Sequence, residues 1–255
     1  MPYADNAGVQ IHYEVEGVGA PLVLQHGFTD TIEGWSEYGY VAALRSKYRL
    51  ILVDARGHGK SDCPHDAEAY ALDRRTADVT AVLDAIGVTK AHFWGYSMGG
   101  WIGFGMARYV PDRLGALIIG GHHPYARGQS GFHQLIRTGI TEGGDSLVDA
   151  FTKMAGPISD AYRARVRAGD LHAWLASVGD RPSSMEDMLG GMTMPCCLYA
   201  GDADSIYTQA KQASERIPGA RFFSVPGLGH VPTFARSELV LPRVTAFLEQ
   251  AGPLA

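Results

Sequence analysis

Ser97 stands in a Gly-x-Ser-x-Gly pattern that follows an apolar run and precedes a helix-forming segment. The flanking Gly95 and Gly99 carry no side chains that would collide where a strand turns sharply into a helix. Such a turn exposes the serine hydroxyl at a strained point of the backbone, facing a pocket. The pattern therefore predicts that Ser97 is a nucleophile.

A nucleophilic serine needs a base that takes its proton and a third group that orients the base. On a strand-to-helix turn of this kind, the order along the chain is serine, acid, histidine. Asp202 and Asp204 follow one short apolar run, and His230 follows the next. Both runs resemble buried strands that end at the same sheet edge as Ser97. We predict a triad of Ser97, His230 and Asp204, with Asp202 as the alternative acid.

Short apolar runs typical of buried parallel strands recur along the chain, at residues 21–25, 50–54, 91–96, 114–120, 195–200 and 221–225. Residues 9–15 alternate in polarity and predict an antiparallel edge strand or hairpin arm. The clearest helix is expected over residues 73–86, and a closing helix over 237–250, where Pro242 implies a late start or a kink. This alternation predicts an α/β fold with a mostly parallel central sheet flanked by helices.

Residues 122–192 break the alternation, because they hold three helical stretches, at 132–140, 146–154 and 160–178, and no convincing strand. The segment leaves the sheet after one strand and returns before the next. It should therefore lie over the carboxyl edge of the strands, where open α/β sheets bind ligands. We predict a core domain of residues 1–121 and 193–255 and a small helical cap insertion of residues 122–192.

Composition narrows the classes of partner. The 255 residues are 46% hydrophobic, enough for one large core, and the formal net charge is −5 with no cluster of lysine or arginine. Neither a nucleic-acid surface nor an apolar run of about 18 residues that could span a membrane is expected. The first five residues lack the pattern of a secretory signal, which favours a cytoplasmic protein. Cys63, Cys196 and Cys197 form no metal-ligand or disulfide pattern. A homo-oligomer is compatible with the sequence.

Four motifs together resemble the α/β-hydrolase fold superfamily, in its serine esterase and lactonase branch, across nearly the whole chain. They are His26-Gly27-Phe28, Asp54-x-Arg56-Gly57-His58-Gly59-x-Ser61, the Ser97 turn, and Gly201-x-x-Asp204 with Gly229-His230. The resemblance implies an oxyanion hole made by the backbone N–H groups of Phe28 and Met98. It also implies that Asp54, Arg56 and His58 belong to the scaffold.

The same resemblance locates the start of a substrate pocket near His123 and Tyr125, each of which has an equally good role in hydrogen bonding at the cap hinge. Some members of the superfamily place the acid after the sixth strand, near Gly121, but this chain has His122-His123-Pro124 there. Among the apolar residues of the cap, Trp174 is the first candidate for the pocket wall.

We expect a serine hydrolase that cleaves small to medium carboxylic esters or lactones through an acyl-enzyme, with no metal or organic cofactor. Three alternatives remain open: a carbon–carbon bond hydrolase of ring-cleavage products, a cofactor-free perhydrolase, and a receptor that binds its ligand without turnover. Haloalkane dehalogenases and epoxide hydrolases carry an aspartate at the turn, so the hydroxyl of Ser97 argues against both.

Overall fold

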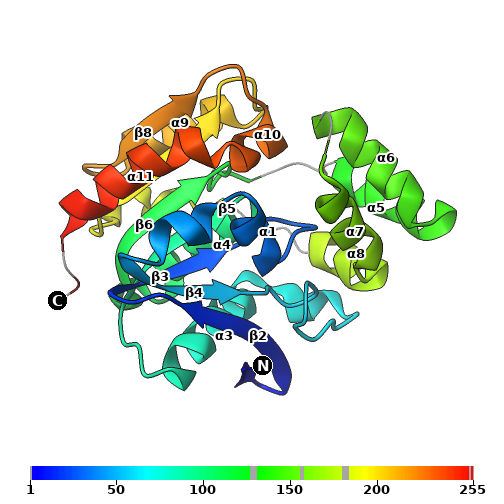
Figure 1. Cartoon of the computed structure of the whole chain (residues 1–255), viewed down its shortest axis with the longest axis horizontal. Coiled ribbons are helices and arrows are strands. Elements are labelled where there is room, and N and C mark those ends of the chain that lie inside the picture. Colours follow the sequence, from blue (N-terminus) through cyan, green and yellow to red (C-terminus); the bar gives the residue numbers. More distant parts are fainter. Residues whose placement is uncertain (1, 127–130, 156–157, 180–183, 253, 255) are drawn as a thin grey trace.

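The computed structural model describes residues 2–126, 131–155, 158–179, 184–252 and 254. Eight strands form one sheet in the order β1-β2-β4-β3-β5-β6-β7-β8 (Figure 1). The strands are β1 (Tyr3–Asn6), β2 (Val9–Glu16), β3 (Ala20–Gln25), β4 (Tyr48–Val53), β5 (Ala91–Tyr96), β6 (Leu114–Gly120), β7 (Cys196–Gly201) and β8 (Arg221–Val225). β2 pairs antiparallel with β1 and β4, and the remaining pairs are parallel. The predicted mostly parallel sheet is confirmed, while β1 was not expected.

Helices cover both faces of the sheet. Their bounds are α1 (Ile32–Glu37), α2 (Tyr40–Leu44), α3 (Leu72–Ala85), α4 (Met98–Tyr109), α9 (Tyr207–Arg216), α10 (His230–Ala235) and α11 (Ser237–Ala251), with short 3₁₀ turns η1 (Ala67–Tyr70), η2 (Pro111–Arg113) and η3 (Glu186–Gly191). α11 begins at Ser237, so Pro242 lies inside the helix and does not delay its start.

Side chains of each strand alternate between the two faces, as the pleat requires. On β3, Val23 packs in the cluster under α3 and α4, whereas Leu22 and Leu24 pack in the cluster under α1, α2 and α11. The central strands are therefore buried on both sides, which explains why each reads as a continuous apolar run.

Among the described residues between β6 and β7 are four α-helices, in the segment predicted as the cap and called the cap below: α5 (Gly131–Glu142), α6 (Gly144–Ala155), α7 (Asp160–Ala168) and α8 (Leu171–Gly179). They stand to one side of the sheet in Figure 1. The prediction of one helical stretch over 160–178 is wrong, because the chain breaks at Gly169. A β-carbon on Gly169 would lie 2.0 Å from the Trp174 ring, and the Asp170 carboxylate accepts hydrogen bonds from the first N–H groups of α8.

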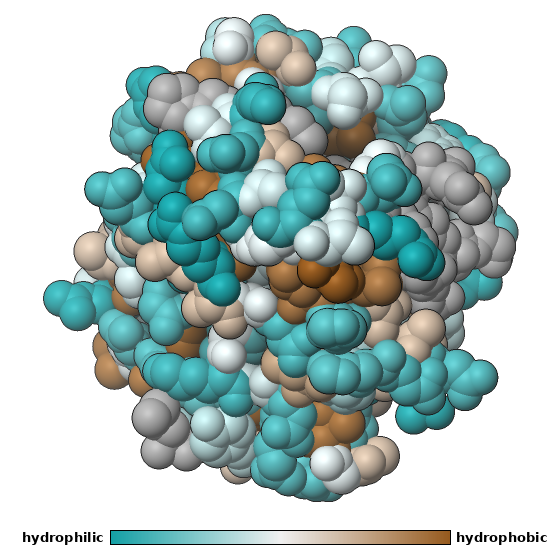
Figure 2. Space-filling model, turned by 90° about the vertical axis from the view of Figure 1, so that its right-hand side faces the viewer, coloured by the Kyte–Doolittle hydropathy of each residue, from teal (hydrophilic) through white to brown (hydrophobic). Residues whose placement is uncertain are grey.

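The cap has an apolar interior of its own, in which Ile136, Leu147, Phe151, Val166 and Trp174 are buried. Figure 2 shows the side of the molecule that carries the cap, where hydrophilic residues cover most of the surface and hydrophobic residues gather near the centre. By contrast, the side chains of Met185, Leu189, Met192 and Met194 pack with the core cluster of the sheet. Among the described helices, none is both long and apolar enough to cross a membrane.

Candidate active site

Ser97 occupies the turn between β5 and α4, with backbone angles of φ 52° and ψ −112°. Positive φ is costly for a residue with a side chain, by about 1–3 kcal/mol. The two glycines of the motif permit the turn: a β-carbon on Gly95 would lie 2.1 Å from the carbonyl oxygen of Gly99, and one on Gly99 would lie 2.1 Å from that of Gln25. The tight turn thus depends on both glycines.

Three side chains from distant parts of the chain meet at this turn. The Nε2 atom of His230 lies 2.8 Å from the Ser97 hydroxyl oxygen, and its Nδ1 atom lies 2.7 Å from a carboxylate oxygen of Asp204. Asp204 is almost fully buried, whereas a third of the His230 side chain is exposed. The Tyr96 hydroxyl donates to the carbonyl of His230 over 2.5 Å and fixes the loop that carries it. The arrangement can take the proton from a serine hydroxyl.

The neighbouring carboxylate, Asp202, contacts the backbone of the loop before His230. It is exposed, and it accepts a hydrogen bond of 2.6 Å from the backbone N–H of Gly227. It therefore braces the loop that leads to His230. A side chain at position 121, after β6, would be crowded, since a β-carbon on Gly121 would lie 3.0 Å from the His230 ring.

The turn after β3 approaches Ser97 closely. A β-carbon on Gly27 would lie 3.3 Å from the β-carbon of Ser97, and Phe28 lines the cavity beside the hydroxyl. Met98 begins α4, so its N–H is among those that the helix itself leaves without a partner, at the positive end of the helix dipole. The Met98 side chain points elsewhere, and its sulfur accepts from Arg75 over 3.2 Å.

The topology explains why these turns converge. In the sheet, β3 lies between β4 and β5. The chain passes from β3 to β4 on one side of it, and then from β4 to β5 on the other side. Ligands of open α/β sheets bind at such a reversal of strand order, outside the carboxyl ends of the strands. Gly27 follows β3, Ser97 follows β5, and the loops that carry Asp204 and His230 follow β7 and β8 at the same edge.

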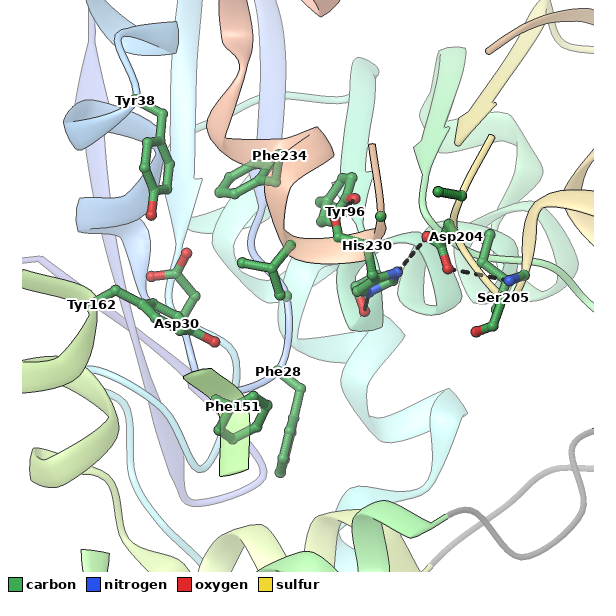
Figure 3. Close-up of a pocket in the computed structure, with 16 residues that line it drawn as sticks. Phe28, Asp30, Tyr38, Tyr96, Phe151, Tyr162, Asp204, Ser205, His230 and Phe234 are labelled. Carbon is green, nitrogen blue, oxygen red and sulfur yellow. Dashed lines mark hydrogen bonds and ion pairs between the residues drawn. The ribbon is translucent and has the colours of Figure 1, made fainter. Parts of the chain in front are cut away.

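A cavity of about 390 Å³ opens beside Ser97 and His230 (Figure 3). Its wall comes from both the core and the cap: besides the triad residues it includes Phe28, Asp30, Tyr38, Tyr96, Phe151, Tyr162, Ile206 and Phe234. Most of these were not predicted. Asp30 carried a signal, because it follows the His26-Gly27-Phe28 motif at the carboxyl end of a strand. Tyr162 carried none, since only the docking of α7 brings it here.

Trp174, the predicted wall residue, is not among the residues that line the cavity. Its indole N–H donates to the carbonyl of Gly57 over 2.9 Å, and its ring stacks on His58 with centroids 5.6 Å apart. Trp174 is only 2% exposed. It therefore joins α8 to the core, and its ring contacts Phe28, a residue of the cavity wall.

His123 and Tyr125 also lie outside the cavity wall. The His123 Nδ1 atom accepts a hydrogen bond of 3.2 Å from the backbone N–H of Tyr125. The Tyr125 ring lies under the guanidinium of Arg216, 5.9 Å from its centroid. For both residues, a role in substrate binding or at the cap hinge stays a prediction.

The cap docks on the core through polar contacts at one end of the cavity. The Tyr162 hydroxyl lies 2.7 Å from that of Thr29, a residue with φ 67°. The Arg165 guanidinium lies 2.7 Å from carboxylate oxygens of both Asp30 and Glu37. α7 therefore holds the loop after β3, whose first turn lies close to Ser97.

The buried loop after β4 forms a scaffold of polar contacts. Asp54 accepts hydrogen bonds from the backbone N–H groups of Ile32 and Lys60, and Arg56 pairs with Asp78. His58 is 2% exposed, and burial is the main cause that holds its pKa well below the ordinary value. Among the described residues, no group of three or more histidines, cysteines or carboxylates could hold a metal ion.

The depressed pKa of His58 predicts a pH dependence of stability. At pH values between the folded-state pKa of His58 and the ordinary value of about 6.5, the His58 side chain is protonated in the unfolded chain but neutral in the folded chain. The free energy of unfolding should therefore fall as the pH drops below about 6.5, by up to about 1.4 kcal/mol per pH unit from this group. His92, whose pKa burial also lowers, acts with the same sign.

Urea unfolding between pH 5 and pH 8 measures this slope. The variant His58→Asn retains a donor for the Arg56 carbonyl and does not titrate, so it should be less stable than wild type at neutral pH but lose less stability on acidification. Identical slopes for the two proteins would show that His58 does not cause the effect.

A family model described as the alpha/beta hydrolase fold matches residues 20–127. The enol-lactonase from Burkholderia xenovorans LB400 superimposes with a TM-score of 0.87 at 23% identity, over 97% of this chain and 100% of that chain. The esterase RhEst1 from Rhodococcus sp. ECU1013 superimposes with a TM-score of 0.86 at 27% identity, over 98% of each.

This chain has the α/β-hydrolase fold. A segment of 116 residues, 45% of the chain, is 34% identical to epoxide hydrolase 4 of Mus musculus, and spans 32% of that protein's length. The family match ends at residue 127, so it includes Ser97 but neither Asp204 nor His230, nor the cap helices. For the second half of the chain, the likeness therefore rests on the superposed structures.

Proposed function

We propose that this protein is a serine hydrolase that cleaves small to medium carboxylic esters or lactones. The observation that carries the proposal is the continuous contact from Ser97 through His230 to Asp204, at the wall of a cavity. A volume of about 390 Å³ is in the lower part of the range for small-molecule sites. The likeness to an esterase with 27% identity over 98% of both chains supports the same reaction class.

In this mechanism the Ser97 hydroxyl attacks the ester carbonyl while His230 Nε2 takes its proton over the 2.8 Å contact. The Asp204 carboxylate accepts a hydrogen bond from the His230 Nδ1–H group, which holds the ring in the required tautomer and stabilises the imidazolium. The backbone N–H groups of Phe28 and Met98 donate to the developing oxyanion, and the dipole of α4 adds to the stabilisation.

The tetrahedral intermediate collapses when His230 gives the proton to the leaving alkoxide, and the alcohol departs. Water then attacks the acyl group on Ser97, with His230 as the base, and the carboxylic acid leaves as Ser97 recovers its proton. No step calls for a metal ion or an organic cofactor.

The residue at the turn distinguishes this proposal from epoxide hydrolysis, the activity in the name of one relative. An aspartate nucleophile forms an ester with the epoxide carbon, and water then releases the diol. An alkyl ether on Ser97 would resist that second step, whereas an acyl group would not. Ser97 therefore favours acyl transfer over ring opening of an epoxide.

Turnover of p-nitrophenyl esters of increasing acyl length tests the proposal. We expect release of p-nitrophenolate by the wild-type protein at neutral pH. We also expect inactivation by one equivalent of a p-nitrophenyl alkylphosphonate, which loses p-nitrophenolate as its phosphonyl group becomes attached to the peptide containing Ser97. A folded protein that hydrolyses none of these esters, yet cleaves a ring-cleavage product at a carbon–carbon bond, would contradict it.

A further inference from the structure

The cavity has a polar end that the proposed chemistry does not use. Ser97 and His230 lie at one end, and aromatic side chains line much of the wall between. Figure 3 shows the Asp30 carboxylate at the other end, between the hydroxyl-bearing rings of Tyr38 and Tyr162. A carboxylate in an apolar cavity is costly to bury, so its presence there calls for a reason.

Local structure is adapted to place this carboxylate. One oxygen of Asp30 accepts from the backbone N–H of Thr31 over 2.9 Å and lies 2.7 Å from Arg165. The other oxygen lies over Gly34 of α1, where a β-carbon would come within 2.2 Å of it. A glycine inside a helix costs about 1 kcal/mol relative to alanine. Gly34 therefore lowers the intrinsic stability of α1, but it leaves the space that the Asp30 carboxylate occupies.

The two tyrosines add hydrogen-bonding capacity of a definite kind. The Thr29 hydroxyl donates to the carbonyl of Phe28 over 2.6 Å, so the 2.7 Å contact with Tyr162 uses the tyrosine proton. The Tyr162 oxygen is then left as an acceptor. Tyr38, on the opposite side of Asp30, has a hydroxyl that can accept or donate.

The charge of this end is negative. The carboxylates of Asp30 and Glu37 share one guanidinium, that of Arg165. The Ser159 hydroxyl donates to Glu37 over 2.5 Å but carries no charge. Burial raises the pKa of Asp30, mainly because the carboxylate is removed from water, and a cation from the ligand would relieve this cost.

We infer that Asp30, Tyr38 and Tyr162 form a subsite for a hydrogen-bond-donating end group of the substrate, an ammonium or a hydroxyl remote from the scissile carbonyl. The inference rests on the proposed function, because it specifies the class of ester. An ammonium group gains most, since it also balances the second carboxylate. A terminal carboxylate is repelled, and a methyl group makes no hydrogen bond to these acceptors.

Matched p-nitrophenyl esters test the subsite: hexanoate, 6-hydroxyhexanoate, 6-aminohexanoate and the monoester of adipate, with shorter and longer homologues to find the chain length that spans the cavity. At the best length, we expect kcat/KM for the amino and hydroxy esters to exceed that of the methyl-ended ester by about tenfold, with the carboxylate-ended ester slowest.

Variants assign the preference to residues. Asp30→Asn retains the shape and an acceptor for Thr31, and should reduce the preference for the amino ester over hexanoate to about twofold, a ratio that corrects for any change in hydrolysis common to both esters. Asp84→Asn, at an exposed carboxylate paired with Arg113, is the matched control and should retain the full preference. If Asp30→Asn does not fold, Tyr38→Phe removes a hydroxyl from the same subsite and should lower the preference for both polar esters.

The two proposals fail in different ways. Equal kcat/KM for the methyl-, hydroxyl- and amine-ended esters at every length would overturn the subsite and leave the hydrolase intact. Absence of all turnover would overturn the hydrolase. Calorimetric titration of Ser97→Ala with the corresponding ethyl esters then still tests the subsite, which equal affinities would overturn.

Discussion

Replacing Ser97 by alanine should lower kcat for the best p-nitrophenyl ester by roughly 10⁴ to 10⁶-fold. The change removes the attacking oxygen and leaves the β-carbon that packs against the turn after β3. KM should change little, because the cavity wall remains. Initial rates under saturating substrate, measured after exhaustive removal of contaminating esterases, give the value.

Ser205→Ala is the matched control for that experiment. Ser205 lines the same cavity and is exposed, next to Asp204 in the chain. Its loss should change kcat by no more than about threefold. Circular dichroism and thermal unfolding must show that both variants are folded. An Ser97→Ala protein that hydrolyses esters at the wild-type rate would refute the nucleophile.

Asp204→Asn should lower kcat by about 10⁴-fold, the second largest effect we expect. An amide at this position can donate to His230 Nδ1, which would place the imidazole proton on Nε2, where the base must be free. The side chain hardly changes in size, so the loop that begins α9 should stay in place. The loss should appear in kcat more than in KM.

Asp202→Asn is the decisive partner of that variant, because it makes the same chemical change two residues away. An asparagine oxygen at 202 can still accept from the Gly227 N–H, so kcat should stay within about threefold of wild type. If Asp202→Asn proved the more damaging of the two, the assignment of the acid to Asp204 would be refuted.

The strands could be predicted because burial on both faces leaves a direct trace in the sequence. The short runs at β3 to β8 were all recognised, whereas β1, with four residues of which one is buried, was missed. Gly169 and Asp170 did signal the break between α7 and α8. A glycine followed by a helix-capping aspartate is such a signal, but the apolar spacing on either side concealed it.

The proposed triad could be located from sequence because each member follows a strand, and strands fix the edge at which their loops emerge. The cavity wall could not. Phe151 and Tyr162 lie on cap helices. The spacing of apolar residues in these helices predicts an apolar face, but it does not identify the surface against which that face packs. Trp174 has the same spacing, yet a hydrogen bond to Gly57 places it against the core.

The contacts between α7 and the loop after β3 set a condition on recombination. The cap is one continuous stretch of chain, so a single exchange of coding sequence could replace it. Any incoming segment must present a hydroxyl to Thr29 and a cation to Asp30 and Glu37, or the loop that carries Phe28 loses its outer support. Donor caps compatible with this core should therefore be recognisable by a tyrosine and an arginine three residues apart on one helix.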